Sequence, residues 1–245
     1  MSEAQGLSGP SVTDRELLGL LQLADSGFPS GAFTLSHGLE TMASEGLIRT
    51  AADLEELLEV ILVSRLGMAD LPAVLAAHDI ASAPWSATRS MERLSRVDRA
   101  LRAVKLAREE RDGSERVGRR LAAEAYAAAP SAALDAFLLS IGSQATPGNS
   151  AIAFGLAAAA FGVERRRGAV AAGSTFASAF AMAAVRLGLI GHRAGQLAIR
   201  RSAPSIERAV DLATHADPLD PRPCSPQLDV ALARHETAPM RAFAS

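Results

Sequence analysis

The feature that most constrains the fold of this chain is the spacing of its apolar residues, which repeats with the period of an α-helix over most of its length. Thr13 with Glu16, and Thr50 with Asp53, match helix caps in which side chains satisfy free backbone N–H groups of the first turn. Behind the second cap, five apolar residues fall on one helical face: Leu54, Leu57, Leu58, Ile61 and Leu62. Helices are therefore expected to begin after residues 13 and 50.

No stretch alternates polar and apolar residues with the β-branched enrichment of a strand, and no Asn-Gly or Asp-Gly turn joins two such stretches. We therefore expect an all-α fold, a single-domain helical bundle of about ten helices with a flexible C-terminal tail. One long, charged helix is predicted over 89–121. Further helices are predicted at about 31–46, 69–82, 131–143, 149–162, 169–187 and 203–216.

The character of the chain changes after Asp217. Four prolines exclude a helix there and predict a stiff, extended linker: Pro218, Pro221, Pro223 and Pro226. Beyond them, a short helical pattern places four residues on one side: Leu228, Ala231, Leu232 and His235. Burial of Leu228, Leu232, Met240 and Phe243 would contribute roughly 6 to 12 kcal/mol, less than the cost of ordering about twenty residues of the tail at about 1 to 2 kcal/mol each. This predicts a disordered N-terminus (1–12), a helical domain (13–217), and a linker with a mobile, partner-binding tail (218–245).

Two uncharged stretches, 136–163 and 168–185, resemble membrane spans in composition. Pro147 breaks the first into pieces too short for about 30 Å of hydrocarbon, and the second is rich in small residues that insert weakly. We interpret both as helices buried in a soluble bundle. The N-terminus has no secretory pattern, and the single cysteine, Cys224, fits a reducing compartment, so the expected location is the cytoplasm.

The formal charge of −2 and the pI near 6.2 argue against a nucleic-acid partner. Residues 89–121 are nevertheless locally basic. One interpretation is a solvated helix face with i,i+4 ion pairs, such as Glu92 with Arg96 and Asp98 with Arg102; the other is a surface for an acidic partner.

The sequence shows no enzyme signature. The five histidines are His37, His78, His192, His215 and His235. No two of them have the i,i+3 or i,i+4 spacing that places two metal ligands on one helical face. Cys224 has no second cysteine and no nearby base, and neither a phosphate-binding loop nor a GxSxG motif occurs. We therefore predict no catalytic residue, no stable metal site and no cofactor.

Four segments remain that these arguments do not explain. LLQLADSGFPSGAFTLSHGLE (20–40) resembles the N-terminal signature of the urease accessory protein UreF family, and the tail from RHET (234–237) to the end of the chain resembles its C-terminal signature. GNSAIAFGLAAAAFGV (148–163) and AAVRLGLIGHRAGQ (183–196) match weaker central motifs in the same order. The tail departs from the family where Ala238 and Pro239 replace Leu-Tyr and where Ala242 replaces a larger apolar residue, which reduces the surface it offers.

The resemblance implies an all-helical, dimeric, non-catalytic scaffold that assembles with UreD (also called UreH) and the GTPase UreG on urease apoprotein for nickel insertion. It also implies which residues contact partners, with the phenylalanines as apolar anchors and the C-terminal arginine as a charged donor. These residues are Phe33, Ser36, Glu40, Arg234, His235, Glu236, Arg241 and Phe243. The alternatives are a metal-dependent hydrolase and a helical interaction protein unrelated to urease.

Overall fold

The computed structural model describes residues 12–237 and 243. This part contains twelve α-helices, three short helical turns and no strand, so the prediction of a single all-α domain is confirmed. The helices are α1 (Asp14–Ala24), α2 (Leu39–Ser44), α3 (Ala51–Val60), α4 (Asp70–Ser82), α5 (Ala87–Ala103), α6 (Arg108–Ala128), α7 (Ala132–Gly142), α8 (Ser150–Ala160), α9 (Arg165–Arg186), α10 (His192–Arg201), α11 (Ala203–His215) and α12 (Pro226–His235). The turns are η1 (Ala32–Thr34), η2 (Ile61–Arg65) and η3 (Leu66–Met68). The predicted disordered segment 1–12 lies outside the described residues except for Val12.

Both capping signals start helices where the sequence places them. Thr13 Oγ1 accepts a hydrogen bond from the backbone N–H of Glu16 at 3.2 Å. The box at Thr50 is complete, because its hydroxyl accepts from the N–H of Asp53 and the Asp53 carboxylate accepts from the N–H of Thr50. Of the apolar residues behind this cap, all are buried except the half-buried Leu57. Local chemistry therefore determines where α1 and α3 begin.

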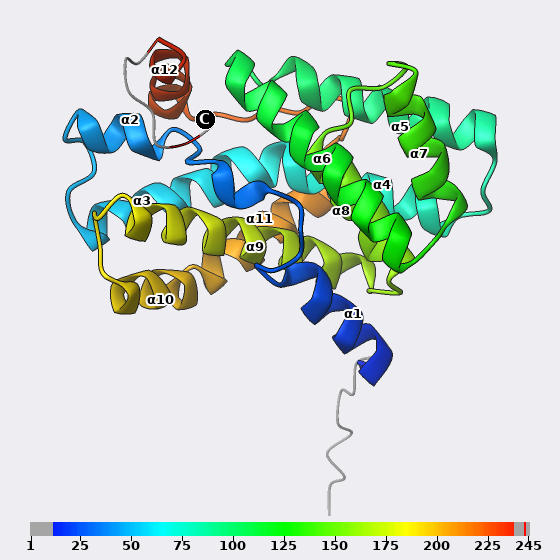
Figure 1. Ribbon diagram of the computed structural model, residues 1–245, viewed down its shortest axis with the longest axis horizontal. Coiled ribbons are helices and arrows are strands. Elements are labelled where there is room, and N and C mark those ends of the chain that lie inside the picture. Colours follow the sequence, from blue (N-terminus) through cyan, green and yellow to red (C-terminus); the bar gives the residue numbers. More distant parts are fainter. Residues whose placement is uncertain (1–11, 238–242, 244–245) are drawn as a thin grey trace, which may run out of the picture.

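The core consists of two apolar clusters that share α4 and α9. One cluster draws its buried residues mainly from α4 to α8, and the other from α2, α3, α9, α11 and α12. Figure 1 shows the first group of helices on the right and the second on the left, with α9 crossing the lower part of the molecule. α4 and α8 lie in close contact because a Cβ atom at Gly155 would overlap the carbonyl oxygen of Val74.

Three predicted boundaries differ from the structure. The segment 31–46 is not one helix, because Gly31, His37 and Gly38 have φ angles of 77°, 53° and 80°, which a right-handed helix excludes. The single helix predicted over 89–121 is two helices, α5 and α6, with a break at 104–107. The sequence analysis placed no helix between 187 and 203, where the structure has α10.

The predicted surface ion pair of Asp98 is also wrong. Predicted to pair with Arg102 on the surface, Asp98 is fully buried in the structure. Its carboxylate accepts hydrogen bonds from Thr146 Oγ1 at 2.7 Å and from the side-chain amide of Asn149 at 2.7 Å, while Arg102 pairs with Glu115 at 2.6 Å. The acidic group therefore holds the loop before α8 instead of neutralising the surface of α5.

The structure also differs from the prediction of a flexible tail. Residues 218–225 are non-helical as expected, but 217–220 form a turn instead of an extended segment. The backbone N–H of Arg222 donates to the carbonyl oxygen of Met68 at 3.0 Å, and α12 buries Leu228 and Leu232 in the second core cluster. The prediction compared the cost of ordering the tail with the burial of the tail's own apolar residues and included no receiving surface. The domain supplies apolar surface and hydrogen-bond partners on the other side, so α12 belongs to the same core as α2 and α3.

α9 is the one described helix that is long and apolar enough to cross a membrane, and α3 to η3 with α4 could form a second, bent span. Half of the apolar window in α9 is buried, and the helix packs against α4, α8, α10 and α11. This is the environment of a core helix, as predicted for 168–185.

Candidate functional site

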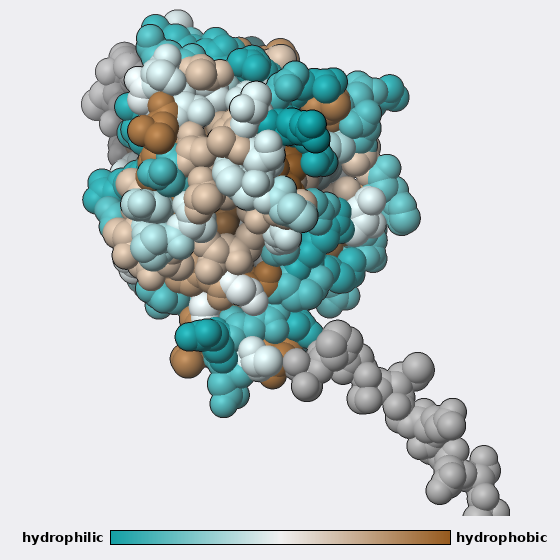
Figure 2. Space-filling view, turned by 90° about the vertical axis from the view of Figure 1, so that its right-hand side faces the viewer, coloured by the Kyte–Doolittle hydropathy of each residue, from teal (hydrophilic) through white to brown (hydrophobic). Residues whose placement is uncertain are grey.

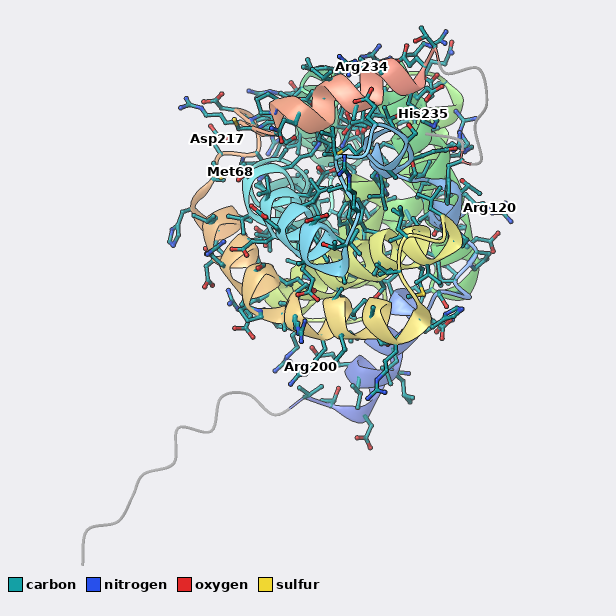
Figure 3. The ribbon with its side chains drawn as sticks, turned by 90° about the vertical axis from the view of Figure 1, so that its left-hand side faces the viewer. Met68, Arg120, Arg200, Asp217, Arg234 and His235 are labelled. Atoms are coloured by element: carbon teal, nitrogen blue, oxygen red, sulfur yellow. The ribbon has the colours of Figure 1, made fainter. Side chains whose placement is uncertain are left out.

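Segments from opposite ends of the chain meet where α2 packs against α12. Glu40, on α2, hydrogen bonds to two residues of the tail: its Oε2 lies 3.1 Å from His235 Nε2 and accepts the backbone N–H of Phe243 at 3.1 Å. The ring of Phe243 is half-buried, and its centroid lies 5.0 Å from the guanidinium carbon of Arg186 on α9. We call this contact region the α2–α12 junction; Figure 3 labels Arg234 and His235 at the end of α12.

His235 is the centre of the junction and is only 1% exposed. Its second ring nitrogen, Nδ1, lies 2.6 Å from Glu109 Oε2 in the first turn of α6. A buried polar ring is stable only when its nitrogens have hydrogen-bond partners, and here carboxylates from two different helices supply them. The imidazole therefore links α12 to both α2 and α6.

The residues on either side of His235 bind the same two helices. Arg234 forms an exposed ion pair with Glu45, which follows α2, at 2.9 Å. Glu236 Oε1 accepts the backbone N–H groups of Arg108 at 2.5 Å and Glu109 at 3.3 Å. The residue that precedes α6 is an alanine, which has no capping side chain, so Glu236 caps this helix from the far end of the chain.

The first turn of α12 is held by Arg65, at the end of the π-helical turn η2. Its guanidinium donates to Ser225 Oγ at 2.7 Å, to Asp229 Oδ1 at 2.7 Å, and to both oxygens of Glu110 at 2.8 Å. Burial opposes the charge, but the carboxylates of Glu110 and Asp229 outweigh it and raise the pKa of Arg65. Both ends of α12 are therefore attached to α6.

A cavity of about 180 Å³ lies behind the junction, lined mainly by apolar side chains of α4, α6, α8, α9 and α12. Lys105, the only lysine of the chain, is in its wall and pairs with Asp70 at 2.9 Å. Burial, followed by the charge of Lys105, lowers the pKa of His37 to about 4, so this half-buried ring is neutral at pH 7. Thr175 Oγ1, also in the wall, is the one buried side-chain polar atom of the described residues without a hydrogen-bond partner.

The structure brings together five of the eight residues predicted to bind partners: Glu40, Arg234, His235, Glu236 and Phe243. All five contact other parts of the chain. Ser36 is fully buried beside α2, while the side chain of Phe33 and the whole of Arg241 lie outside the described residues. Four further residues of the site were not predicted, because only spatial contact distinguishes them from ordinary charged residues of a helical surface: Glu45, Arg65, Glu109 and Glu110.

The described residues contain no group of three or more histidine, cysteine or acidic side chains placed to hold a metal ion. Cys224 is exposed in the linker before α12.

A second surface of note lies on α1, which projects from the body of the molecule in Figure 1. One side of this helix packs through Leu23 into the first core cluster. The other side exposes Leu17, Leu18 and Leu21, which are 46%, 67% and 56% accessible. Figure 2 shows apolar atoms on this projection, beside the grey N-terminal trace. An exposed apolar stripe of this kind is typical of a protein–protein contact.

Comparison with known families decides which family this chain belongs to. The UreF family model matches residues 48–203, which extend from before α3 to the start of α11 and make up more than half of the chain.

The chain belongs to the UreF family.

Curated relatives match nearly the whole of this UreF-family chain. A urease accessory protein UreF of Corynebacterium glutamicum (strain R) is 31% identical over 92% of this chain and 96% of its own length. Proteins of the same description from Bacillus sp. (strain TB-90) and Trichodesmium erythraeum (strain IMS101) are 30% and 28% identical, each over 94% of this chain. The UreF family is a family of urease accessory proteins, and the sequence-based assignment to it is confirmed.

Proposed function

We propose that this protein is a non-catalytic scaffold of urease maturation. It assembles with UreD (UreH) and the GTPase UreG on urease apoprotein, in the cytoplasm, so that nickel can be inserted into urease. Membership of the UreF family supports an accessory role, and the resemblance of the two signature segments suggests the partners.

The α2–α12 junction is the observation that carries this proposal. Glu40 ends the N-terminal signature, and His235 and Phe243 belong to the C-terminal signature, yet all three meet in space. A partner that covers the junction would contact both signatures at once. The hydrogen bonds of His235 and Glu236 to α2 and α6 hold the tail in one position before the partner arrives, which lowers the entropic cost of binding. In this arrangement the buried residues position the tail, and Phe243 with Arg241 contacts the partner.

Copurification with tagged UreD tests this assignment. Most of the UreD that copurifies with the unchanged protein is expected to be lost with the variant R241A/F243A, because an aromatic anchor and a charged donor dominate many interfaces. The control L197A/R200A removes the same kinds of group from the exposed face of α10. Retention of UreD by R241A/F243A would contradict the assignment. Deletion of all residues after 217 is a poorer test, since it removes the buried Leu228 and Leu232 from the core.

The same scaffold is proposed to be a homodimer that associates through α1. Leu17, Leu18 and Leu21 form an apolar stripe on a projecting helix, and a second copy of the same stripe is self-complementary, as a two-fold interface requires. L18E is expected to shift sedimentation from dimer to monomer. L139E, at a leucine of α7 that is 68% exposed against 67% for Leu18, is expected to leave the dimer intact. Equal effects of the two variants would exclude α1 as the interface.

The absence of catalysis has a direct test. The purified protein, supplied with nickel and urea but without urease, is expected to release no ammonia. Turnover above a heat-inactivated sample would refute the scaffold proposal.

A further inference from the structure

A stripe of arginines runs along the outer face of α5. Arg89, Arg93 and Arg96 occupy the i, i+4 and i+7 positions and are all exposed. Seven residues of α-helix rise by about 10 Å, so the three guanidiniums lie along one line roughly two turns long. No carboxylate of the described residues is within ion-pair distance of any of them. We call these three residues the α5 stripe.

Part of the charge of the stripe is unfavourable within the isolated chain, although the exposed Glu92 lies between Arg89 and Arg96 on the same helix face. Like charges at i,i+4 destabilise a helix, and Arg89 lies in the first turn, where the helix dipole disfavours a cation. The first turn has no acidic residue, and Ser86 makes no side-chain capping bond. The two ion pairs that would make this an ordinary solvated face are not formed, because Asp98 is buried against the loop before α8 and Glu92 forms no ion pair with any of the described residues.

The surroundings of the stripe limit what can bind there. None of the exposed large apolar residues of the described chain lies on α5, so this face has nothing to insert into a lipid bilayer. The neighbouring helix α7, which packs against α5, exposes Leu139. Figure 2 views the molecule from this side, where the middle of the face is of intermediate hydropathy and the margins are hydrophilic. The chain as a whole has a charge of −2, which disfavours extended polyanions such as nucleic acids.

We propose that the α5 stripe is a docking surface for an acidic protein segment, a helix whose carboxylates are spaced by one turn. Each guanidinium of the stripe binds a carboxylate through two parallel N–H···O hydrogen bonds, a geometry that arginine offers and lysine does not. The surface is separate from the α2–α12 junction, so it adds a contact beyond those in the proposed function.

A peptide binding assay tests this proposal on the full-length protein. The probe is a fluorescein-labelled helical peptide with glutamates at i, i+4 and i+7, and the reference is the same peptide with glutamines. R93E/R96E is expected to weaken binding of the glutamate peptide about tenfold, since two attractive pairs become repulsive. R193E/R200E is the matched control, because it makes the same change in net charge at two exposed arginines of α10, at the opposite end of the molecule from α5 in Figure 1.

The control variant is expected to bind within about twofold of the unchanged protein, and a lysine version of the peptide should bind R93E/R96E better than it binds the unchanged protein. Equal losses in the two variants would show a general charge effect and overturn the proposal, as would tighter binding of a DNA oligonucleotide or of phosphatidylserine vesicles at physiological salt. Absence of any difference between the glutamate and glutamine peptides would overturn it as well. This assay contains neither UreD nor UreG, so its outcome does not depend on the urease assignment.

Discussion

Glu40 and His235, which are 195 residues apart in the chain, are joined by a partly buried hydrogen bond of 3.1 Å between Oε2 and Nε2. The bond closes the fold, because it connects the end of the N-terminal signature to the last turn of the last helix. Since His235 also binds Glu109, displacing α12 would leave two carboxylates and an imidazole without the hydrogen bonds that offset their burial.

α12 is therefore expected to be ordered in the free protein. In hydrogen exchange, the backbone amides from Asp229 to His235 should be protected before any partner is added, because they donate within the helix and its apolar side is buried. Exchange of these amides at the rate of an unfolded peptide would show instead that the tail docks only in a complex.

The long-range cap on α6 predicts a specific loss of stability. Glu236→Ala removes the acceptor for the N–H groups of Arg108 and Glu109 and should lower the free energy of unfolding by about 1 kcal/mol. Glu236→Gln keeps an acceptor oxygen and should lose less. Glu207→Ala, at an exposed site on α11, is the control in urea denaturation. A loss at residue 207 equal to that at residue 236 would argue against capping.

Close packing of α8 on α4 predicts that Gly155 tolerates no side chain. Gly155→Ala places a Cβ atom against the carbonyl oxygen of Val74 and should destabilise the fold by about 1 to 3 kcal/mol or more. Gly142→Ala is the matched control, since nothing lies within 4 Å of the position its Cβ would take. The control should change stability by less than about 1 kcal/mol. Thermal unfolding of the two variants measures the difference.

The environment of His37 predicts a pH dependence of stability. Its pKa is lowered from 6.5 to about 4, so between these values the unfolded state binds more protons than the folded state. The contribution of neutral His37 is therefore fully present above pH 6.5 and is lost as the pH falls towards 4, by roughly 1 to 3 kcal/mol.

His37→Asn should flatten the stability profile in this window, because asparagine does not titrate and accepts the positive φ of this site. His192→Asn, at an exposed histidine, should leave the profile unchanged. A C2–H resonance of His37 that titrates near 6.5 would disprove the argument.

Much of the fold was predictable because it depends on neighbours in sequence. Caps at Thr13 and Thr50 act over three residues, and the apolar period behind Thr50 needs only the geometry of one helix. The side of α12 that carries Leu228 and Leu232 was predicted in the same way. Predictions were wrong where a residue distant in the sequence supplies the interaction partner. Asp98 is the clearest example, since its charge is taken up by the loop before α8 instead of by the neighbouring Arg102.

The candidate site, too, was predictable only in part. The signature residues Glu40, His235 and Glu236 were singled out from the sequence, but their contacts with Glu109 and the N-terminus of α6 were not. By itself, the sequence determined the helical class, the start of several helices and the family. Only the tertiary structure decided that the tail packs into the core, because the free energy of burying an apolar helix depends on the surface that receives it, and distant segments supply that surface.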